Sequence, residues 1–328
     1  MKAGVPKTRL EVKDLERLRQ LFLNAPEQSG VSDYWSDSSL LALYDATFAR
    51  RISWKWQAVL ESLLAKGWNP PGADSRWIDW GCGSGVALEM VAKTFDDTPP
   101  ATCVVSDRSI HAQRFAAEKI RSLLPKTSVL QASPDRVEVG ARDFVVLSHV
   151  LTELTEMQLT ALINTLKPAH SILWVEPGTP FCSHRLIAVR ERLRGNFHVH
   201  APCPHQSACG LAGDDRNWCH FFAAPPSDIF QDSDWMHFSK ELKIDLRSLP
   251  LSYLLLEKKS AAIHAPEQQS HSRIIGRPRF YKGHAKMLAC NTNGVSEITL
   301  QERHHKSDFK KWKSDAFSVE LTSVPDCD

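Results

Sequence analysis

Asp79-Trp80-Gly81-Cys82-Gly83-Ser84-Gly85 is the stretch of sequence that decides the fold. Residues 77–80, which are apolar apart from Asp79 and lead into this stretch, predict a strand, and the residues from 86 onward predict a helix. The glycines between them allow positive backbone φ angles and a close approach of the backbone to another molecule. Amide groups at the start of the helix would point toward this turn. We therefore predict a strand, a tight turn and a helix, with room for a ligand at the turn.

Short apolar segments and helical segments alternate after this turn. Residues 77–80, 103–106, 128–131, 144–148 and 172–175 have the pattern of strands, and residues 185–193 have the pattern of a helix after the fifth strand. Strands separated by helices are typical of parallel βαβ units. The predicted fold class is α/β, with an open, Rossmann-like sheet.

The spacing of the glycines discriminates between ligands. A dinucleotide-binding turn requires Gly-x-Gly-x-x-Gly, but Val86 occupies the third glycine position. The pattern instead resembles the first motif of class I S-adenosylmethionine methyltransferases. Asp107 lies at the end of the second strand, where a carboxylate would hold ribose hydroxyls, and Asp135 follows the third strand, where it could serve the adenine. The candidate cofactor-binding residues are Asp79, Gly81, Gly83, Gly85, Asp107 and Asp135.

The fourth strand ends in Leu147-Ser148-His149-Val150-Leu151-Thr152-Glu153-Leu154. Many amino-methylating enzymes carry Asn/Asp-Pro-Pro-Tyr here, and that tetrad is absent. His149 and Glu153 are weak candidates for a catalytic base. A packed or capping histidine and a glutamate on a solvated helix face are the competing interpretations. No convincing catalytic residue emerges from the sequence.

Four cysteines form a second candidate site. Cys203, Cys209 and Cys219 lie in a stretch rich in Pro, His and Gly, and Cys290 lies further along the chain. Four thiolates suit either tetrahedral zinc or a 4Fe-4S cluster. The wide spacings, without Cys-x-x-Cys pairs, favour the cluster over zinc, although ordinary buried cysteines remain an alternative. Four further cysteines are interpreted as structural or incidental: Cys82, Cys103, Cys182 and Cys327.

Composition and charge bound the remaining possibilities. The chain has 328 residues, a net charge of +2 and eight cysteines, which is too few for a secreted disulfide framework. No apolar run reaches the length of about 20 residues that a membrane helix needs, so we expect no membrane partner. We expect a bacterial cytoplasmic protein, with the mitochondrial matrix as the less favoured compartment. Residues 273–313 contain ten basic and three acidic residues, which predicts a polyanion-binding region but no DNA partner.

Several stretches together resemble the methyltransferase-like family of mitochondrial small-subunit ribosome assembly factors and its bacterial relatives. They are Leu173-Trp-Val-Glu-Pro-Gly-Thr-Pro180, Ala201-Pro-Cys-Pro-His205, Trp218-Cys-His-Phe221, Ser252-Tyr-Leu254 and the residues 277–284 before Cys290. The resemblance runs over about residues 40–313. It implies that Cys203, Cys209, Cys219 and Cys290 hold a 4Fe-4S cluster, and that the protein acts on the small ribosomal subunit and its rRNA.

Four parts are expected along the chain. Residues 1–70 would form an N-terminal helical cap, 71–194 the S-adenosylmethionine-binding Rossmann-like domain, 195–235 the cysteine-rich 4Fe-4S insertion, and 236–328 the remaining strands and a basic C-terminal region. Within the last part we expect residues 252–257 and 286–291 to be strands that close the sheet, and residues 261–272 to be a polar loop. Residues 195–234 are expected to be a loop.

Two functions of different class fit these observations. The first is an S-adenosylmethionine-dependent rRNA methyltransferase that acts during ribosome biogenesis and carries an iron–sulfur cluster. The second is a non-catalytic, RNA-binding assembly factor that uses the same fold and cluster. A zinc-binding methyltransferase of another substrate class is a third, less favoured possibility.

Overall fold

A computed structural model describes residues 9–24, 35, 38–260, 272–314 and 320–321. The chain divides into two compact units. The first unit comprises Met1–Glu176 and Ala223–Leu249, and the second comprises Pro177–Phe222 and Pro250–Asp328. Cys327 and residues 261–271 of the expected polar loop lie outside the described residues.

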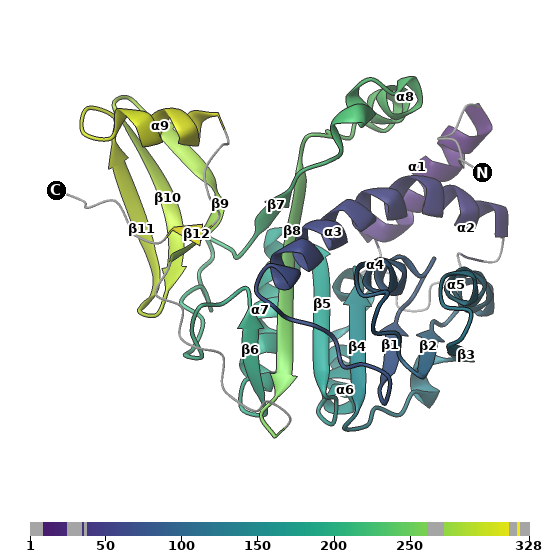
Figure 1. Ribbon diagram of the computed structural model, residues 1–328. Coiled ribbons are helices and arrows are strands. Elements are labelled where there is room, and N and C mark those ends of the chain that lie inside the picture. Colours follow the sequence, from purple (N-terminus) through teal and green to yellow (C-terminus); the bar gives the residue numbers. More distant parts are fainter. Residues whose placement is uncertain (1–8, 25–34, 36–37, 261–271, 315–319, 322–328) are drawn as a thin grey trace. The chain divides into compact units, whose positions relative to one another are not determined.

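The first unit is built on parallel strands in the order β3-β2-β1-β4-β5 (Figure 1). These strands are β1 (Arg76–Trp80), β2 (Thr102–Ser106), β3 (Ser128–Ala132), β4 (Asp143–Ser148) and β5 (Ser171–Pro177). The central strands are buried along nearly their whole length, because helices cover both faces of a parallel sheet. The predicted α/β class and the five predicted strands are therefore confirmed.

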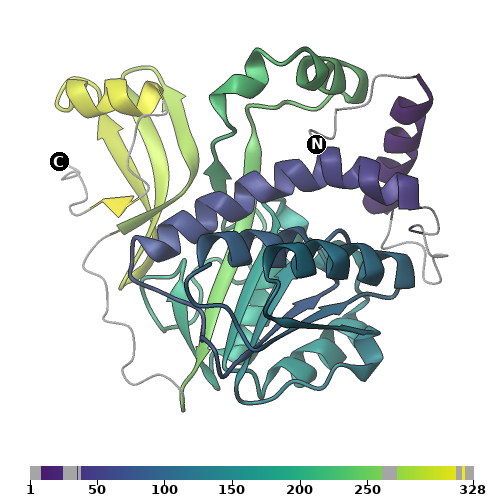
Figure 2. The same cartoon turned by 45° about the vertical axis from the view of Figure 1, so that its right-hand side comes forward.

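Helices form layers on this sheet. On one face, α4 (Val86–Thr94) contacts β1 and β4, and α5 (Ile110–Leu123) contacts β2 and β3. The longer α3 (Arg50–Leu64) packs across α4, as the second view shows (Figure 2). The helix α6 (Glu156–Leu166) lies behind the strands in Figure 1, and short 3-10 turns η3 (Pro134–Arg136) and η4 (Leu151–Glu153) follow β3 and β4.

Within the described N-terminal ranges, residues 9–24 and 38–64 are helical, as the apolar spacing predicts. The helix α1 (Arg9–Asn24) buries Leu15 and Leu18, and α2 (Ser38–Tyr44) continues into η2 (Asp45–Ala49), a single π-helical turn. Such turns are frequent at functional sites. The first unit also contains η5 (Ser227–Phe230) and α8 (Ser233–Leu242), which contacts α1. No helix in the described ranges is long and apolar enough to cross a membrane.

In the second unit, α7 (Pro180–Leu193) precedes β6 (Phe197–Ala201), which runs antiparallel to β8 (Leu249–Lys258); β7 (Phe221–Ala223) also pairs with β8. The prediction of a loop over residues 195–234 was wrong for β6, β7, η5 and the start of α8. In β6, Phe197 and Val199 are buried and alternate with His198 and His200. This two-residue period is that of a strand with one covered face.

A separate antiparallel sheet follows, with strand order β11-β10-β9-β12. Its strands are β9 (Ser272–Tyr281), β10 (His284–Asn291), β11 (Gly294–Gln301) and β12 (Glu320–Leu321). The helix α9 (Lys306–Lys313) packs Phe309 and Trp312 against Met287 and Leu300 of this sheet. The prediction that residues 286–291 close the first sheet was therefore wrong, because β10 has its own apolar face and its own covering helix.

Candidate functional site

The glycine turn follows β1 directly. Gly81, Gly83 and Gly85 all have positive φ angles, of 73°, 49° and 76°, and Gly85 is the N-cap of α4. The amides of Gly81 and Cys82 donate hydrogen bonds to the carbonyl oxygen of Ser106, at 2.8 and 2.9 Å. The turn is therefore held against the end of β2, and the predicted order of strand, turn and helix is confirmed.

The three glycines differ in what surrounds them. A Cβ atom on Gly81 would lie 2.6 Å from Cγ1 of Val150, and one on Gly85 would lie 2.9 Å from Cβ of Ala116. A Cβ atom on Gly83 would meet nothing within 4 Å. Packing of the protein itself thus requires glycine at positions 81 and 85. At position 83 the turn faces open space, which a bound molecule could fill.

Asp107 ties the end of β2 to this turn. Its Oδ2 accepts a hydrogen bond from the Gly83 amide at 2.9 Å, and its Oδ1 accepts one from the Ser109 amide at 2.9 Å. A carboxylate has about four lone-pair sites, so both oxygens can accept a further bond from a ligand hydroxyl. The carboxylate that we expected at a ribose is thus placed beside the open side of the turn.

Asp79 is completely buried under the turn. Its Oδ2 accepts a hydrogen bond from the Leu88 amide at 3.4 Å, and no described residue contacts its buried Oδ1 through a hydrogen bond. Burial raises the pKa of this carboxyl to about 7. Asp79 therefore supports the first turn of α4 from below, whereas Asp135 lies on the exposed η3 turn after β3, where the Ser133 side chain lowers its pKa.

Two candidate polar residues lie at the ends of neighbouring strands of the first unit: His149 directly follows β4, and Glu176 lies near the end of β5. His149 has a φ of 57°, a left-handed conformation that is strained for a residue other than glycine. Burial lowers its pKa well below the ordinary value, and its Nε2 is buried without a hydrogen-bond partner among the described residues. Its ring is therefore neutral at physiological pH. Backbone strain of this kind concentrates at functional sites.

Glu176 holds the backbone that follows His149. Its Oε1 accepts hydrogen bonds from the amides of Val150 and Leu151 and from the Trp174 indole, at 2.9, 3.1 and 2.6 Å. Burial raises the pKa of Glu176 to about 7. Glu153, the other candidate base, forms an ion pair with Arg108 at 3.2 Å.

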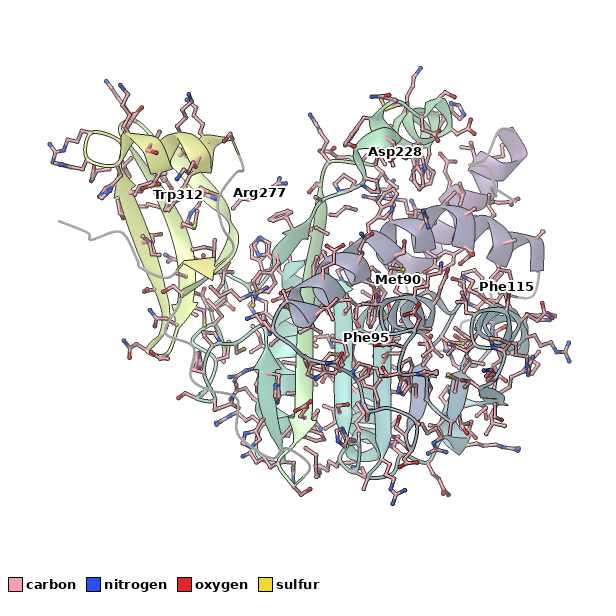
Figure 3. All side chains as sticks on the ribbon, in the orientation of Figure 1. Met90, Phe95, Phe115, Asp228, Arg277 and Trp312 are labelled. Carbon is pink, nitrogen blue, oxygen red and sulfur yellow. The ribbon has the colours of Figure 1, made fainter. Side chains whose placement is uncertain are left out.

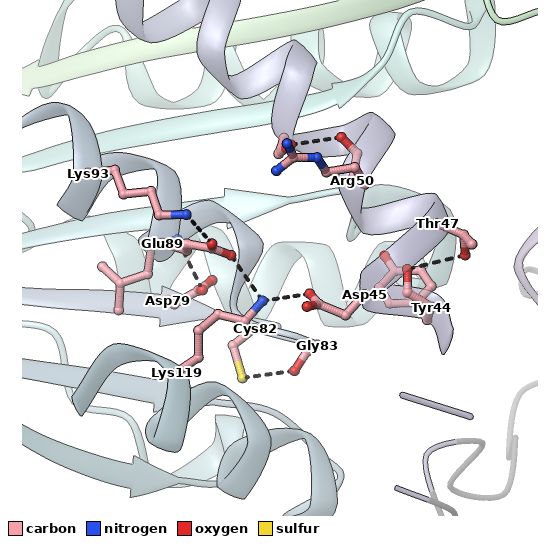
Figure 4. Close-up of polar contacts among 12 residues, drawn as sticks. Tyr44, Asp45, Thr47, Arg50, Asp79, Cys82, Gly83, Glu89, Lys93 and Lys119 are labelled. Atoms are coloured by element: carbon pink, nitrogen blue, oxygen red, sulfur yellow. Dashed lines mark hydrogen bonds and ion pairs between the residues drawn. The ribbon is translucent and has the colours of Figure 1, made fainter. Parts of the chain in front are cut away.

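A lysine joins the helices around the turn (Figure 4). Lys119 of α5 contacts Asp45 of η2 at 2.5 Å and Glu89 of α4 at 3.0 Å. The neighbouring Tyr44 has its pKa raised by burial and then by the charges of Glu153, Asp45 and Asp107. Tyr44, which immediately precedes the π-helical turn, therefore lies within electrostatic range of Asp107 after β2 and Glu153 after β4.

The second unit brings the four candidate cysteines together. Burial raises the pKa of Cys219 well above its ordinary value, and the like charges of Cys203, Cys209 and Cys290 raise it further. The pKa of Cys290 is raised to about 12 by burial and by Cys203 and Cys209. Apolar side chains pack beside them, namely Ile187, Leu211 and Ile275.

Polar groups contact two of these sulfurs. Arg190 of α7, which is 2% exposed, donates from Nε to Cys203 Sγ at 3.2 Å and from Nη2 to the carbonyl oxygens of His205 and Ser207. His205 Nε2 lies 3.5 Å from Cys290 Sγ. Within the described part of the chain, no three His, Cys, Asp or Glu side chains are arranged to hold a single metal ion.

A sequence comparison identifies the family. The sequence profile of the family described as "Mitochondrial small ribosomal subunit Rsm22" matches residues 46–318, which is most of the chain. The chain belongs to the Rsm22 family. This agrees with the resemblance expected from the stretches around the cysteines. No curated protein matches the chain.

Solved structures with likeness to this Rsm22-family chain include methyltransferases. The N-methyltransferase NodS from Bradyrhizobium japonicum, in complex with S-adenosyl-L-homocysteine, is 13% identical, with a TM-score of 0.40 over 73% of this chain and 98% of that chain. Magnesium protoporphyrin IX methyltransferase from Synechocystis, with bound S-adenosylmethionine, is 12% identical, with a TM-score of 0.39 over 75% and 97%. An S-adenosylmethionine-dependent methyltransferase from Aquifex aeolicus is 17% identical, with a TM-score of 0.38 over 51% and 92%. At these TM-scores the likeness does not establish a function.

Sequence reasoning missed several residues at both candidate sites of this Rsm22-family member. Tyr44 and Lys119 carry no local motif, and only packing brings them near the turn. Arg190 falls on the buried side of a predicted helix, where an arginine without a partner would be unfavourable. A charged arginine at an apolar position of the predicted helix was therefore the one sign in the sequence that Arg190 contacts an anion or several carbonyl groups.

Proposed function

We propose that this Rsm22-family protein binds S-adenosylmethionine at the glycine turn of its first unit. The observation that carries the proposal is the open space at Gly83 beside the Asp107 carboxylate. Asp79, Gly81, Gly83, Gly85 and Asp107 would hold the cofactor, and Asp135 would serve the adenine. When bound, S-adenosylmethionine supplies an electrophilic methyl group on its sulfonium. The residues fit this cofactor because the turn faces open space at Gly83, and Asp107 beside it can accept hydrogen bonds from ribose hydroxyls.

Two further assignments belong to the same proposal. The four cysteines Cys203, Cys209, Cys219 and Cys290 would hold a 4Fe-4S cluster, and the protein would act on the small ribosomal subunit and its rRNA during assembly. The family description and the basic residues 273–313 support the ribosomal partner. RNA, and no DNA, is the nucleic acid that we propose. The bacterial cytoplasm is the proposed compartment, although the family description is mitochondrial.

Four thiolates suit either a zinc ion or a 4Fe-4S cluster, and we propose the cluster because the wide spacing of the cysteines lacks Cys-x-x-Cys pairs. Four thiolates in mutual electrostatic range repel one another, and positive iron together with the Arg190 guanidinium would offset that repulsion. A single zinc ion requires all its sulfurs within about 2.3 Å of one point, whereas each thiolate of a 4Fe-4S cluster binds a different iron. When bound, the cluster would crosslink the stretch around Cys203 to β10.

Catalysis is the property that distinguishes the two candidate functions. If methyl transfer occurs, it would depend mainly on positioning the acceptor. His149 is a neutral ring with a free Nε2, and Glu153 is paired with Arg108, so a strong base at neutral pH is not evident. A non-catalytic assembly factor with the same fold, cofactor and cluster is the second candidate function. The buried, strained His149 favours the enzyme, and the missing amine-gripping tetrad favours the assembly factor.

Separate measurements test the cofactor, the metal and the catalytic parts of the proposal. Calorimetry should detect S-adenosylmethionine binding, and protein purified anaerobically should be brown and contain iron and sulfide. If the protein is instead colourless and contains one equivalent of zinc, the four cysteines hold zinc and the cluster assignment is wrong.

Incubation of small-subunit RNA with labelled cofactor should separate the enzyme from the assembly factor. A His149→Ala/Glu153→Ala variant should lose any methyl transfer and should still bind rRNA. If this folded variant binds rRNA but fails to support assembly, the enzyme is favoured.

A further inference from the structure

The antiparallel sheet of the second unit has two faces of different chemistry. One face packs Ile274, Ala285, Met287 and Leu300 against α9. The residues that alternate with these along the strands lie on the other face, because successive side chains of a strand point to opposite sides of the sheet. The pairing of β9 with β10 places Arg279 beside Lys286 and Tyr281 beside His284 on this second face.

The second face is itself divided into two ends. At one end, Ile275, Leu288, Cys290 and Val295 pack with Cys209 and Cys219. A register shift between Lys286 and Leu288 then separates this end from the rest of the face. Gly276 lies in that irregular segment, with a φ of 71°, and a Cβ atom there would lie 2.9 Å from the His220 ring. Bulges of this kind re-aim the side chains that follow them.

The other end of this face is exposed and aromatic. Tyr281 is 50% exposed, and its ring stacks on His284 with centroids 4.9 Å apart and planes 10° from parallel. Stacking holds the two rings flat at the β9–β10 turn. Phe280 points to the other side, where it contacts Phe309 of α9. The tyrosine ring is therefore the one that this face presents to solvent.

Cationic side chains surround the stacked rings. Arg279 and Lys286 both contact Glu297, at 2.5 and 2.6 Å, and Lys282 is exposed at the turn. Arg277 is an exposed residue of β9 (Figure 3). Its guanidinium carbon lies 4.0 Å from the centroid of the Phe222 ring. Glu297 offsets part of this charge and also fixes the two cations in place along the strands. The exposed end thus combines a flat aromatic surface with flanking positive groups.

We propose that this end of the sheet, formed by Arg277, Arg279, Tyr281, His284 and Lys286, binds unpaired RNA by stacking a base on Tyr281. This inference rests on the proposed RNA-binding function and deepens it. Bases of single-stranded nucleic acid stack on exposed aromatic rings while cations contact the phosphates. A duplex hides its base faces, so we expect single-stranded loops or ends to bind here. The α9 lysines would contribute charge alone.

Fluorescence anisotropy with the full chain tests this inference. The probe is a labelled unstructured RNA of about ten nucleotides, with a duplex and a DNA of the same sequence as competitors. Tyr281→Ala should weaken binding of the single strand about tenfold, which is within the range of base stacking on an aromatic residue. Tyr281→Phe should bind like the parent, because it keeps the ring. Phe230→Ala removes a ring of similar exposure from the first unit and should have no effect.

The outcomes are distinguishable from failure of the broader proposal. If the parent binds RNA and Tyr281→Ala binds equally well, the stacking surface is wrong while RNA binding stands. If the parent prefers the duplex, the inference is also overturned. A parent that binds no RNA would overturn the RNA part of the proposed function as well. Photo-crosslinking of 5-iodouridine RNA gives a second readout on the unaltered chain, and the crosslinked peptide should contain Tyr281.

Discussion

Gly83 and Asp107 are the two residues that most favour a cofactor at the turn, and one hydrogen bond links them. The Gly83 amide donates to Asp107 at 2.9 Å, so the carboxylate and the open side of the turn are held together. Gly81 and Gly85 are required by packing against Val150 and Ala116. Among the three glycines, position 83 is therefore the one where a side chain would meet a ligand before it meets the protein.

Gly83→Val should abolish or reduce S-adenosylmethionine binding at least about tenfold, because the side chain would fill the space open to the cofactor. The positive φ adds strain of roughly 1–2 kcal/mol. Gly67→Val is the matched control, since Gly67 has a φ of 72° and nothing within 4 Å. Calorimetry and thermal unfolding of both variants make the comparison. If the two variants bind S-adenosylmethionine equally tightly, the cofactor does not bind at this turn.

Asp79 makes the stability of the protein depend on pH. Burial raises its pKa to about 7, above the ordinary 3.8. Between these pH values the folded protein keeps a proton that the unfolded chain releases, so stability should fall as pH rises from about 4 to about 7. Asp79→Asn cannot ionise and should remove the share of this dependence that Asp79 contributes, while Glu176, whose pKa is also raised to about 7, keeps its own share. Thermal unfolding across this pH range measures both, and parallel curves would show that Asp79 ionises normally.

At the scale of elements, α7 supports the cysteine stretch through a buried charge. Arg190→Met would leave the carbonyl oxygens of His205 and Ser207 and the sulfur of Cys203 without their donor. Such losses destabilise by about 2–4 kcal/mol. Arg192→Met, on the exposed side of the same helix, should change stability by less than about 0.5 kcal/mol. Denaturant titration of the two variants tests the difference, and equal stabilities would contradict it.

The helix α9 is divided between packing and charge. Phe309 and Trp312 are buried, while Lys310, Lys311 and Lys313 are exposed. Replacing the three lysines by glutamine should lower the slope of log affinity for single-stranded RNA against log salt by about 2, because each phosphate contact contributes about 0.7. Lys13→Gln/Arg17→Gln on α1 is an exposed control. An unchanged slope would mean that these lysines are solvated surface charges.

At the scale of the whole molecule, the candidate cofactor residues lie in the first unit and the four cysteines in the second. Cys290→Ser should lose iron and lower the melting temperature, because one ligand ties β10 to the distant stretch around Cys203. S-adenosylmethionine affinity should persist in the same variant. Iron analysis and calorimetry on one preparation check both. Full iron content in Cys290→Ser would remove it from the ligand set.

Sequence alone determined the parallel strands and the glycine turn of this protein. The strands are short apolar runs between helices, and the turn requires positive φ angles that glycine adopts readily, so both signals are local. Tertiary structure alone decided that β9–β11 form their own sheet and that Arg190 reaches Cys203. It also decided that Cys290 lies beside cysteines roughly seventy to ninety residues earlier in the chain, and that Tyr281 stacks on His284. These contacts depend on strand register and on packing between distant segments, which no local pattern encodes.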